Sequence, residues 1–318
     1  MGNINVAVVG GKDFAPSVGK KGTVTDVTFY EIKKGNDSVT LIEPSKYPDK
    51  LSSLFYAASM SEYAILVVDA IDARLGETIV MLDSVGLDKG WIVLRNFIQK
   101  EQLDPLLAGT CLADYEHIED DAVKTREMLI SFAGTLSKVP GEGSRGSCPV
   151  DSHFNVKGVG TVVLGSVIDG YFRKHDKMRV LPLDKEVVLK SIQKHDIDAD
   201  FAYQGDHVGL ALRGIDSDEL DRGYVLTTDG SVKMTRSVSG RARMVKFWPS
   251  PVKEGMVLHV GHWMQMAPGR VESSSGDPKN PDLRIALESQ IIHKPGDTAL
   301  MMYLEGGKLR VMGSIPLE

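Results

Sequence analysis

Hydrophobic residues in the first 140 positions alternate between short continuous runs and longer helical patterns. The short runs predict buried strands, and they read INVAVVG (4–10), VTDVTFYEI (24–32), SVTLIE (38–43), AILVVDA (64–70) and GWIVLRN (90–96). Helical spacing of apolar positions occurs near Pro48–Met60, Ala73–Val85 and His117–Ala133. This alternation predicts an α/β sheet with helices on both faces. Ligands of such sheets bind beyond the carboxyl ends of the strands, so the residues after Gly10, Glu43 and Asn96 matter most.

The pattern changes at Ser137–Ser152, a stretch rich in Gly, Pro and Ser that predicts a linker. Beyond it, short strands recur at spacings of ~8–12 residues and long helical patterns are absent, which predicts all-β barrels or sandwiches. A break at Thr228–Ser231 divides this half. We therefore expect a nucleotide-binding-like, doubly wound α/β domain over residues 1–140, followed by β-barrels over 141–230 and 231–318.

Composition restricts the class of protein only broadly. The chain has 318 residues, 25% of them charged, and a net charge of -6, which counts weakly against broad nucleic-acid binding. Two local basic stretches, Arg173–Arg179 and Arg241–Lys246, are either nucleic-acid contacts or solvated strand faces. No apolar run approaches the ~20 residues that cross a bilayer. With two cysteines, Cys111 and Cys148, and no signal-peptide pattern, we expect a cytoplasmic protein with no membrane or DNA partner.

The residues after the first strand, GGKDFAPSVGKKGT, begin like a phosphate-binding loop and then depart from it. A GxxxxGK[ST] loop would place glycine and lysine where Ala15 and Pro16 stand. Proline also lacks the N–H that a phosphate cradle uses. A second candidate, GKKGT (19–23), has Lys21 where Ser or Thr would bind magnesium. The residues alone thus leave open a nucleotide switch or the remains of one.

The second half of the chain carries a family resemblance. FNVKGVGTVVLGSVIDG (154–170) resembles the second domain of translational GTPases, where GxGTVVxGxV opens a β-barrel, and GDHVGLALRGIDSDELDRGYVL (205–226) resembles the end of that barrel. GMVLHVGHW (255–263) and PGDTALMMYLEGGKLRVMGSI (295–315) are similar to strands of the third domain. The chain is identified as a member of the elongation factor Tu superfamily. KSIQKHDID (190–198) is similar to the SelB-like branch, which delivers special aminoacyl-tRNAs. The sequence as a whole resembles most the archaeal offshoot of that branch, EF-Pyl, which is linked to pyrrolysine and here has a shortened first domain.

The resemblance also indicates what the nucleotide site lacks. When the family motif GHVDHGKTT is laid from Gly10, only Gly10, Asp13 and Ser17 find equal or similar partners, and Pro16 replaces the lysine. Where the family has DxPGH the chain reads EPSKYP (43–48), and where it has NKxD the chain reads RNFIQ (95–99), which includes Asn96. Most of the first switch is missing, so the carboxyl edge of the sheet should be either open or filled by local side chains, and we expect Phe14, Pro16 and Val18 to fill it. The resemblance therefore implies that binding and hydrolysis of GTP are weakened or lost, with no catalytic residue and no cofactor, although the family uses GTP and Mg²⁺.

Three residues match positions where the family holds the acceptor end of tRNA. Arg222 would contact phosphates at the 5′ end of the acceptor stem, Gln193 would frame the terminal adenosine, and Arg213 is a further candidate on the same barrel. For each, the alternative is an ordinary surface residue. His259 and His262 lie three apart in a strand and face opposite sides, so we expect no metal site there.

The leading hypothesis is a SelB-like translation factor paralogue that binds tRNA, in particular a specialised aminoacyl-tRNA, with the ribosome as a further candidate partner. One alternative is an active GTP-dependent elongation factor with an atypical pocket. Another is a regulatory protein that uses the former switch face for a protein partner. A large exposed apolar patch on the first domain would favour that last hypothesis.

Overall fold

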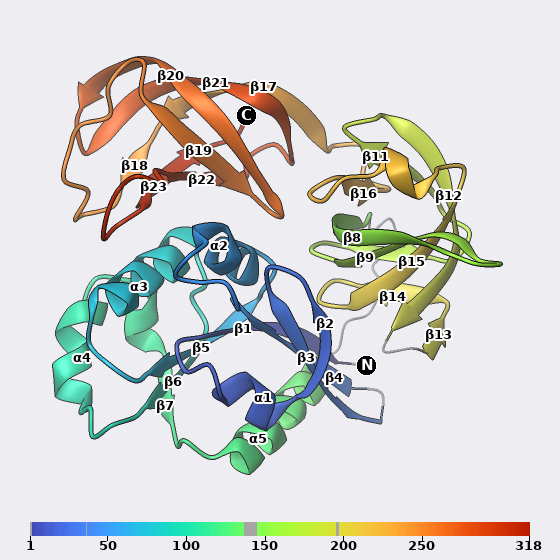
Figure 1. Ribbon diagram of the computed structural model, residues 1–318, viewed down its shortest axis with the longest axis horizontal. Coiled ribbons are helices and arrows are strands. Elements are labelled where there is room, and N and C mark those ends of the chain that lie inside the picture. The colour runs from blue at the N-terminus through green and yellow to red at the C-terminus, as the bar shows by residue number, and fades with distance from the viewer. Residues whose placement is uncertain (1, 36, 137–144, 195–196) are drawn as a thin grey trace.

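The computed structural model of the chain describes residues 2–35, 37–136, 145–194 and 197–318. These residues form three seven-stranded sheets and one two-stranded sheet. Figure 1 shows an α/β domain at the amino end and two β-barrels, one beside it and one above it. The predicted fold class, an α/β domain followed by barrels, is confirmed.

The sheet of the α/β domain has the order β2-β3-β4-β1-β5-β6-β7. Its strands are β1 (Asn3–Val9), β2 (Lys20–Val24), β3 (Thr28–Lys34), β4 (Asp37–Glu43), β5 (Tyr63–Val68), β6 (Gly90–Leu94) and β7 (Glu116–Ile118). The pairings from β4 through β1, β5 and β6 to β7 are parallel, whereas β2 and β3 form an antiparallel edge. Every residue of β1 is buried, because helices cover both faces of the central strands.

Helices α2 (Leu51–Ser59), α3 (Ala73–Val85) and α4 (Lys100–Leu107) cover one face of this sheet, and α1 (Phe14–Val18) and α5 (Ala122–Thr135) cover the other. The predicted bounds of α3 are correct. The predicted helix at His117–Ala133 is wrong at its start, because β7 ends at Ile118 and Asp121 caps α5 by accepting hydrogen bonds from two backbone amides. The hydrophobic pattern does not predict α1 and α4, which are only five and eight residues long.

The first barrel closes through hydrogen bonds. Its strands are β8 (Ser147–Val156), β9 (Gly160–Ser166), β11 (Lys177–Leu181), β12 (Lys185–Lys194), β13 (Ile197–Ala199), β15 (His207–Arg213) and β16 (Val225–Thr227), and the pairing of β11 with β12 completes the circle. A small ribbon of β10 (Tyr171–Arg173) and β14 (Phe201–Tyr203) lies beside it. Residues 137–144 of the predicted linker lie outside the described residues, and β8 already begins at Ser147, so the linker prediction is wrong beyond that point.

The second barrel closes through one bent strand. Its sheet runs β17 (Lys233–Arg241), β21 (Asn280–His293), β20 (Gln265–Asp277), β19 (Val257–His262), β22 (Thr298–Met302), β23 (Val311–Pro316) and β18 (Arg243–Met244). The two end strands, β17 and β18, are consecutive in the chain and separated only by Ala242. The chain therefore pairs with β21 before Ala242 and with β23 after it, which joins the two edges of the sheet.

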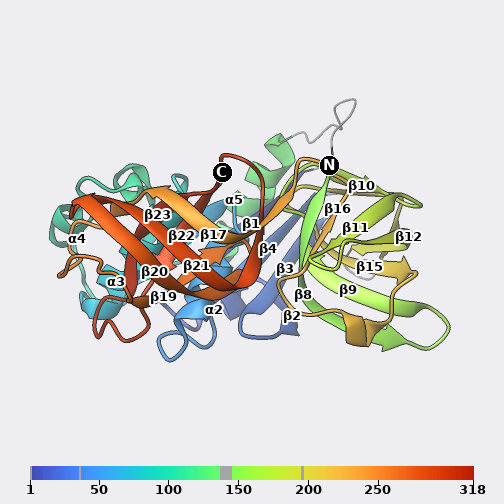
Figure 2. The same ribbon diagram turned by 90° about the horizontal axis from the view of Figure 1, so that it is seen from above.

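The three domains pack against one another. Figures 1 and 2 show the second barrel over α2 and α3, with the first barrel beside β2 and β3. Leu300, Met302 and Val311 of the second barrel join the hydrophobic core that contains α2 and α3. Lys294 bridges the two barrels by pairing with Asp169 and with Asp229. Among the described residues, no helix is long and apolar enough to span a membrane.

Candidate functional site

The turn after β1 differs from a phosphate cradle. Gly10 has a φ of 106°, and a Cβ there would lie 1.8 Å from the carbonyl oxygen of Val67, so only glycine fits. The five-residue α1 follows and buries Phe14 and Val18 in the core beneath the sheet. We expected these two side chains, together with Pro16, to fill the space of a lost phosphate site. Phe14 and Val18 are buried, but Pro16 is exposed, so its expected role as a plug is wrong.

Arg95 occupies the carboxyl edge of the sheet directly after β6. Its Nη1 lies 2.7 Å from Oδ1 of Asp13, and its Nε and Nη2 donate to the two carboxylate oxygens of Asp120 at 2.8 and 2.9 Å. The guanidinium also lies 3.6 Å from Asp69 and 5.7 Å from the centre of the Phe14 ring. Hydrogen bonding from Arg95 lowers the pKa of Asp13, and the bond to Asp120 helps to raise the pKa of Arg95. In the sequence, Arg95 stands out only as a departure from the family motif.

The other residues assigned to the degenerate nucleotide site make local contacts. The side chain of Asn96 donates to the carbonyl oxygen of Asp69 at 2.8 Å. The hydroxyl of Ser17 donates to the carbonyl oxygen of Phe14 at 2.7 Å, within its own short helix. Of the five residues assigned to this site, Gly10 and Asp13 line a cleft that lies beside β1.

This cleft has a volume of about 490 Å³ and lies at the carboxyl ends of β1, β4 and β5. Its ionisable lining consists of four carboxylates, Asp13, Glu43, Asp69 and Asp72, and two cations, Lys12 and Arg74. Phosphate sites need cations or aligned backbone N–H groups, so an excess of carboxylates fits a nucleoside triphosphate poorly. The described residues contain no group of three or more His, Cys, Asp or Glu side chains arranged to hold a metal ion that could offset this charge.

Glu43, which lines the cleft, has one carboxylate oxygen without a hydrogen-bond partner among the described residues. Its Oε2 accepts a hydrogen bond from the hydroxyl of Tyr30 at 3.1 Å, whereas its Oε1 is buried without a hydrogen-bond partner among the described residues. Burial raises the pKa of Glu43 above its ordinary value of 4.5. Burial and the charge of Glu43 raise the pKa of Tyr30 to about 12. An unpaired carboxylate oxygen in a cleft is a natural acceptor for a donor group brought by a ligand.

The predicted tRNA residues Gln193 and Arg213 are exposed on neighbouring strands of the first barrel. Gln193 on β12 pairs with Gly209 on β15, and its side chain donates to Asp198 at 3.0 Å. Arg213 lies at the far end of β15, beside a shallow pocket of about 290 Å³ that Lys190 also lines. The structure therefore does not bring these two residues into one site.

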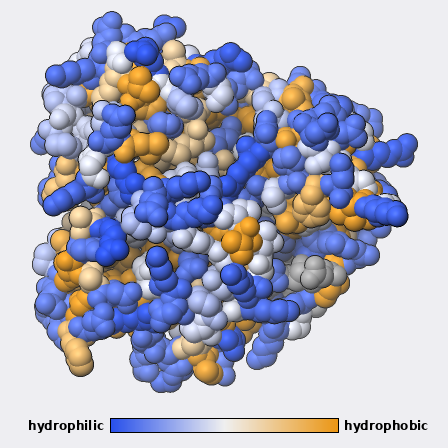
Figure 3. All heavy atoms as spheres, viewed as in Figure 1, coloured by the Kyte–Doolittle hydropathy of each residue, from blue (hydrophilic) through white to orange (hydrophobic). Residues whose placement is uncertain are grey.

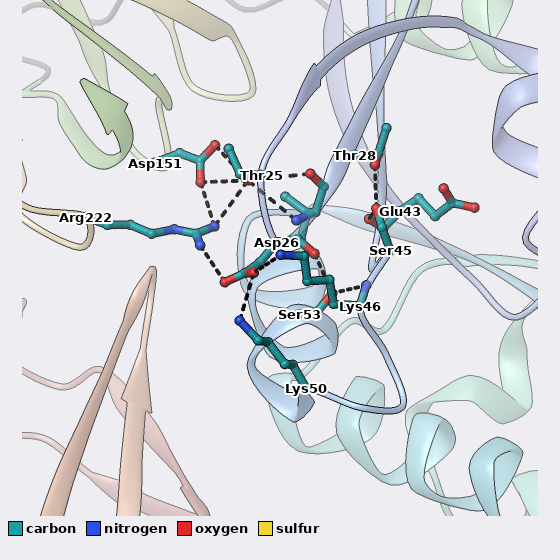
Figure 4. Close-up of polar contacts among 11 residues, drawn as sticks. Thr25, Asp26, Thr28, Glu43, Ser45, Lys46, Lys50, Ser53, Asp151 and Arg222 are labelled. Carbon is teal, nitrogen blue, oxygen red and sulfur yellow. Dashed lines mark hydrogen bonds and ion pairs between the residues drawn. The ribbon is translucent and has the colours of Figure 1, made fainter. Parts of the chain in front are cut away.

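Arg222, the third predicted tRNA residue, lies at the junction of the α/β domain and the first barrel (Figure 4). Its Nη1 lies 2.9 Å from Asp26, which precedes β3, and its Nη2 lies 2.7 Å from Asp151 on β8. The guanidinium covers the ring of Tyr56 on α2, 4.7 Å from the ring centre. Both ends of the guanidinium are thus occupied by carboxylates, and contact with a tRNA phosphate stays a prediction for this residue.

The two carboxylates around Arg222 differ in their protonation equilibria. Asp151 is almost fully buried, and this burial raises its pKa despite the attraction of Arg222. Burial acts in the same direction on Asp26, but hydrogen bonding from Lys46 and the charges of Arg222 and Lys50 outweigh it and lower the pKa. Lys46 and Lys50 lie 3.3 and 3.5 Å from Asp26. This network ties the β2–β3 turn and α2 to the first barrel.

Comparison with known proteins finds relatives of this chain and solved structures with the same fold. Residues 160–227 match the family described as elongation factor Tu domain 2. An uncharacterized protein of Methanocaldococcus jannaschii is 36% identical over 93% of both chains. The selenocysteine-specific elongation factor of the same organism is 24% identical over 90% of this chain and 68% of its own. One similar solved structure is translation elongation factor SelB from Methanococcus maripaludis, in complex with the GTP analogue GppNHp. It superposes with a TM-score of 0.83 and 21% sequence identity, and the match covers 100% of this chain and 79% of that chain. The chain therefore contains an elongation factor Tu domain 2, has the fold of SelB, and belongs to one family with the uncharacterized protein of Methanocaldococcus jannaschii.

Proposed function

We propose that this chain is a SelB-like translation factor paralogue that binds tRNA through its barrels, with GTP binding and hydrolysis weakened or lost. The proposed loss of GTP binding rests on the position of Arg95. Its guanidinium is paired with Asp13 and Asp120 at the sheet edge where the family reads its nucleotide. A nucleotide would have to displace these charge-assisted hydrogen bonds and then face four carboxylates in the adjacent cleft.

Calorimetric titration with GTP and GDP in the presence of magnesium tests the proposed loss of nucleotide binding. We expect no binding at micromolar concentrations. The existence of a cleft of about 490 Å³ beside Gly10 is the one observation that favours the alternative, an active factor with an atypical pocket. A micromolar dissociation constant with a preference for guanine over adenine nucleotides would establish that alternative.

Support for tRNA binding comes from the barrels. Residues 160–227 match elongation factor Tu domain 2. A relative that is 24% identical to this chain is a selenocysteine-specific elongation factor. Arg213 is exposed and has Lys190 for a neighbour, and the two cations can neutralise phosphates. Binding should be insensitive to GTP, because most of the family's first switch is missing from this sequence, and it should fall with salt as counterions are released.

A gel-shift titration with host tRNA at two salt concentrations tests the proposed tRNA binding. Arg213→Ala should weaken binding by about 1–3 kcal/mol if one charge-assisted phosphate contact is lost. The matched control is Arg74→Ala, since Arg74 is also exposed but belongs to the α/β domain. If the intact protein binds no tRNA at low salt, the tRNA proposal is wrong.

A further inference from the structure

Phe97 is the most exposed large apolar side chain among the described residues, with 97% of its surface accessible. It belongs to the loop that joins β6 to α4, at the carboxyl edge of the sheet. Ile71, 44% exposed, follows β5, and Val123, 61% exposed, follows β7. Because β5, β6 and β7 are neighbours in the sheet, all three apolar side chains lie along one edge.

The backbone holds Phe97 in this position. Asn96 and Phe97 have φ values of 52° and 61°, in the left-handed region that bulky L-residues rarely adopt. The side chain of Asn96 donates to the carbonyl oxygen of Asp69, and the side chain of Gln99 donates to the carbonyl oxygen of Phe97. A free aromatic ring on a loop fixed by hydrogen bonds loses little conformational freedom when a partner covers it.

The surroundings of Phe97 are acidic. The hydrogen bond from Asn96 to Asp69 connects this loop to the cleft, whose four carboxylates outnumber its two cations. Arg95 adds no free positive charge, because Asp13 and Asp120 pair with it. Glu43 lines this cleft, and its buried Oε1 has no hydrogen-bond partner among the residues that the structure describes. The edge thus combines an aromatic anchor with an acceptor that requires a donor.

We propose that the carboxyl edge of the α/β sheet binds a basic segment of a partner protein, which covers Phe97 and places a lysine or arginine in the cleft against Glu43 and Asp69. Charge complementarity selects this occupant. A nucleic acid would bring phosphates towards carboxylates, whereas a cationic side chain satisfies Glu43 and gains from the negative potential. This surface is separate from the barrel residues Gln193 and Arg213, so the inference does not depend on tRNA binding.

Site-specific photo-crosslinking in the native host tests the proposal. A benzophenone amino acid replaces Phe97 in the full chain, and the control carries it at Phe247, a phenylalanine of the second barrel that is 69% exposed. We expect one protein adduct that is specific to position 97, with lysine or arginine in the crosslinked peptide. The proposal is overturned by an RNA adduct, by a crosslinked peptide without basic residues, or by equal yields at both positions.

Binding of the purified partner then tests the chemistry. Phe97→Ala and the double variant Glu43→Gln with Asp69→Asn should each raise the dissociation constant about tenfold or more. Asp218→Asn, an exposed carboxylate on the first barrel, should leave it within about twofold. Asp69→Lys should abolish binding, and lysine-to-glutamate exchange in the crosslinked segment should restore it. A partner that binds all these variants equally contradicts the assignment.

Discussion

Nη1 of Arg95 lies 2.7 Å from Oδ1 of Asp13, so the end of β6 is joined to the turn after β1 across the width of β5. The same guanidinium holds both carboxylate oxygens of Asp120, in the loop after β7. One side chain therefore ties together three loops at the carboxyl edge of the sheet. This internal cation takes a structural role at that edge.

Arg95→Ala should lower the free energy of unfolding by about 1–3 kcal/mol, because it removes three charge-assisted hydrogen bonds and leaves Asp13, Asp69 and Asp120 to repel one another. Partial exposure of the carboxylates keeps the loss in this range. Arg74→Ala is the matched control, since Arg74 is exposed and its ion pair among the described residues is with Asp72. Urea denaturation measures the free energy of unfolding of both variants. Equal, small losses for the two variants would show that the Arg95 cluster contributes nothing special.

Glu43 should make stability depend on pH in a defined direction. Because burial raises its folded pKa above 4.5, its contribution to stability is full below that value and is lost as pH rises through the folded pKa. Glu43→Gln keeps an acceptor for Tyr30 and removes the charge, so it should stabilise the protein at pH 7 by about 0.5–1 kcal/mol and leave it unchanged near pH 4. Thermal unfolding at both pH values, with the exposed Glu254→Gln as control, checks this. Destabilisation at pH 7 would contradict it.

Secondary-structure elements were predicted correctly from the sequence where the hydrophobic pattern was long and regular. The continuous apolar run of β1 and the helical period of α3 gave the correct type, and for α3 the correct bounds, because burial on the sheet requires those patterns. The helix at His117–Ala133 began too early because β7 has only three residues, too few to show a strand period. Short elements carry little periodic signal.

The candidate site was less predictable. The family motif located the carboxyl edge, but it marked Arg95 only as a mismatch, because the partners Asp13 and Asp120 are 82 and 25 residues away. Arg222 matched a tRNA-contacting position, and its ion pairs with Asp26 and Asp151 depend on how two domains pack. Long-range charge pairing of this kind leaves no local pattern in a sequence. On the face shown in Figure 3, apolar residues form scattered small patches and no single large one.

Packing between the α/β domain and the second barrel predicts a pair of glycine variants with opposite effects. A Cβ at Gly261 on β19 would lie 2.7 Å from the ring of Phe55 on α2 and 2.5 Å from Met302, so Gly261→Ala should destabilise the protein by about 1–3 kcal/mol. Gly76 in α3 has no neighbour within 4 Å of its added Cβ, and Gly76→Ala should stabilise the helix by about 0.5–1 kcal/mol. Chemical denaturation distinguishes the two signs. If both variants shift in one direction, the tight contact at β19 is not as described.

The junction around Arg222 gives the sharpest test of what that residue does. Arg222→Ala leaves the buried carboxylate of Asp151 without its cation, and it should cost about 2–4 kcal/mol at pH 7. The loss should shrink at lower pH, because removing Arg222 takes away the charge that lowers the already raised pKa of Asp151, and the carboxyl group then protonates. Adding Asp151→Asn to Arg222→Ala should recover part of the stability, since no buried charge remains.

The same variants separate a structural role from tRNA contact. If Arg222 only joins the two domains, the double variant Arg222→Ala with Asp151→Asn should regain stability and bind tRNA as tightly as the parent. If Arg222 also contacts a phosphate, the double variant should regain stability but still bind tRNA more weakly by about 1–3 kcal/mol, with a shallower dependence on salt. Urea denaturation and gel-shift titration on the same preparations give both quantities. Asp151→Asn alone is the control, because it keeps the guanidinium and its pairing with Asp26. A double variant that recovers no stability would show that Asp151 is not the group left unpaired by the loss of Arg222.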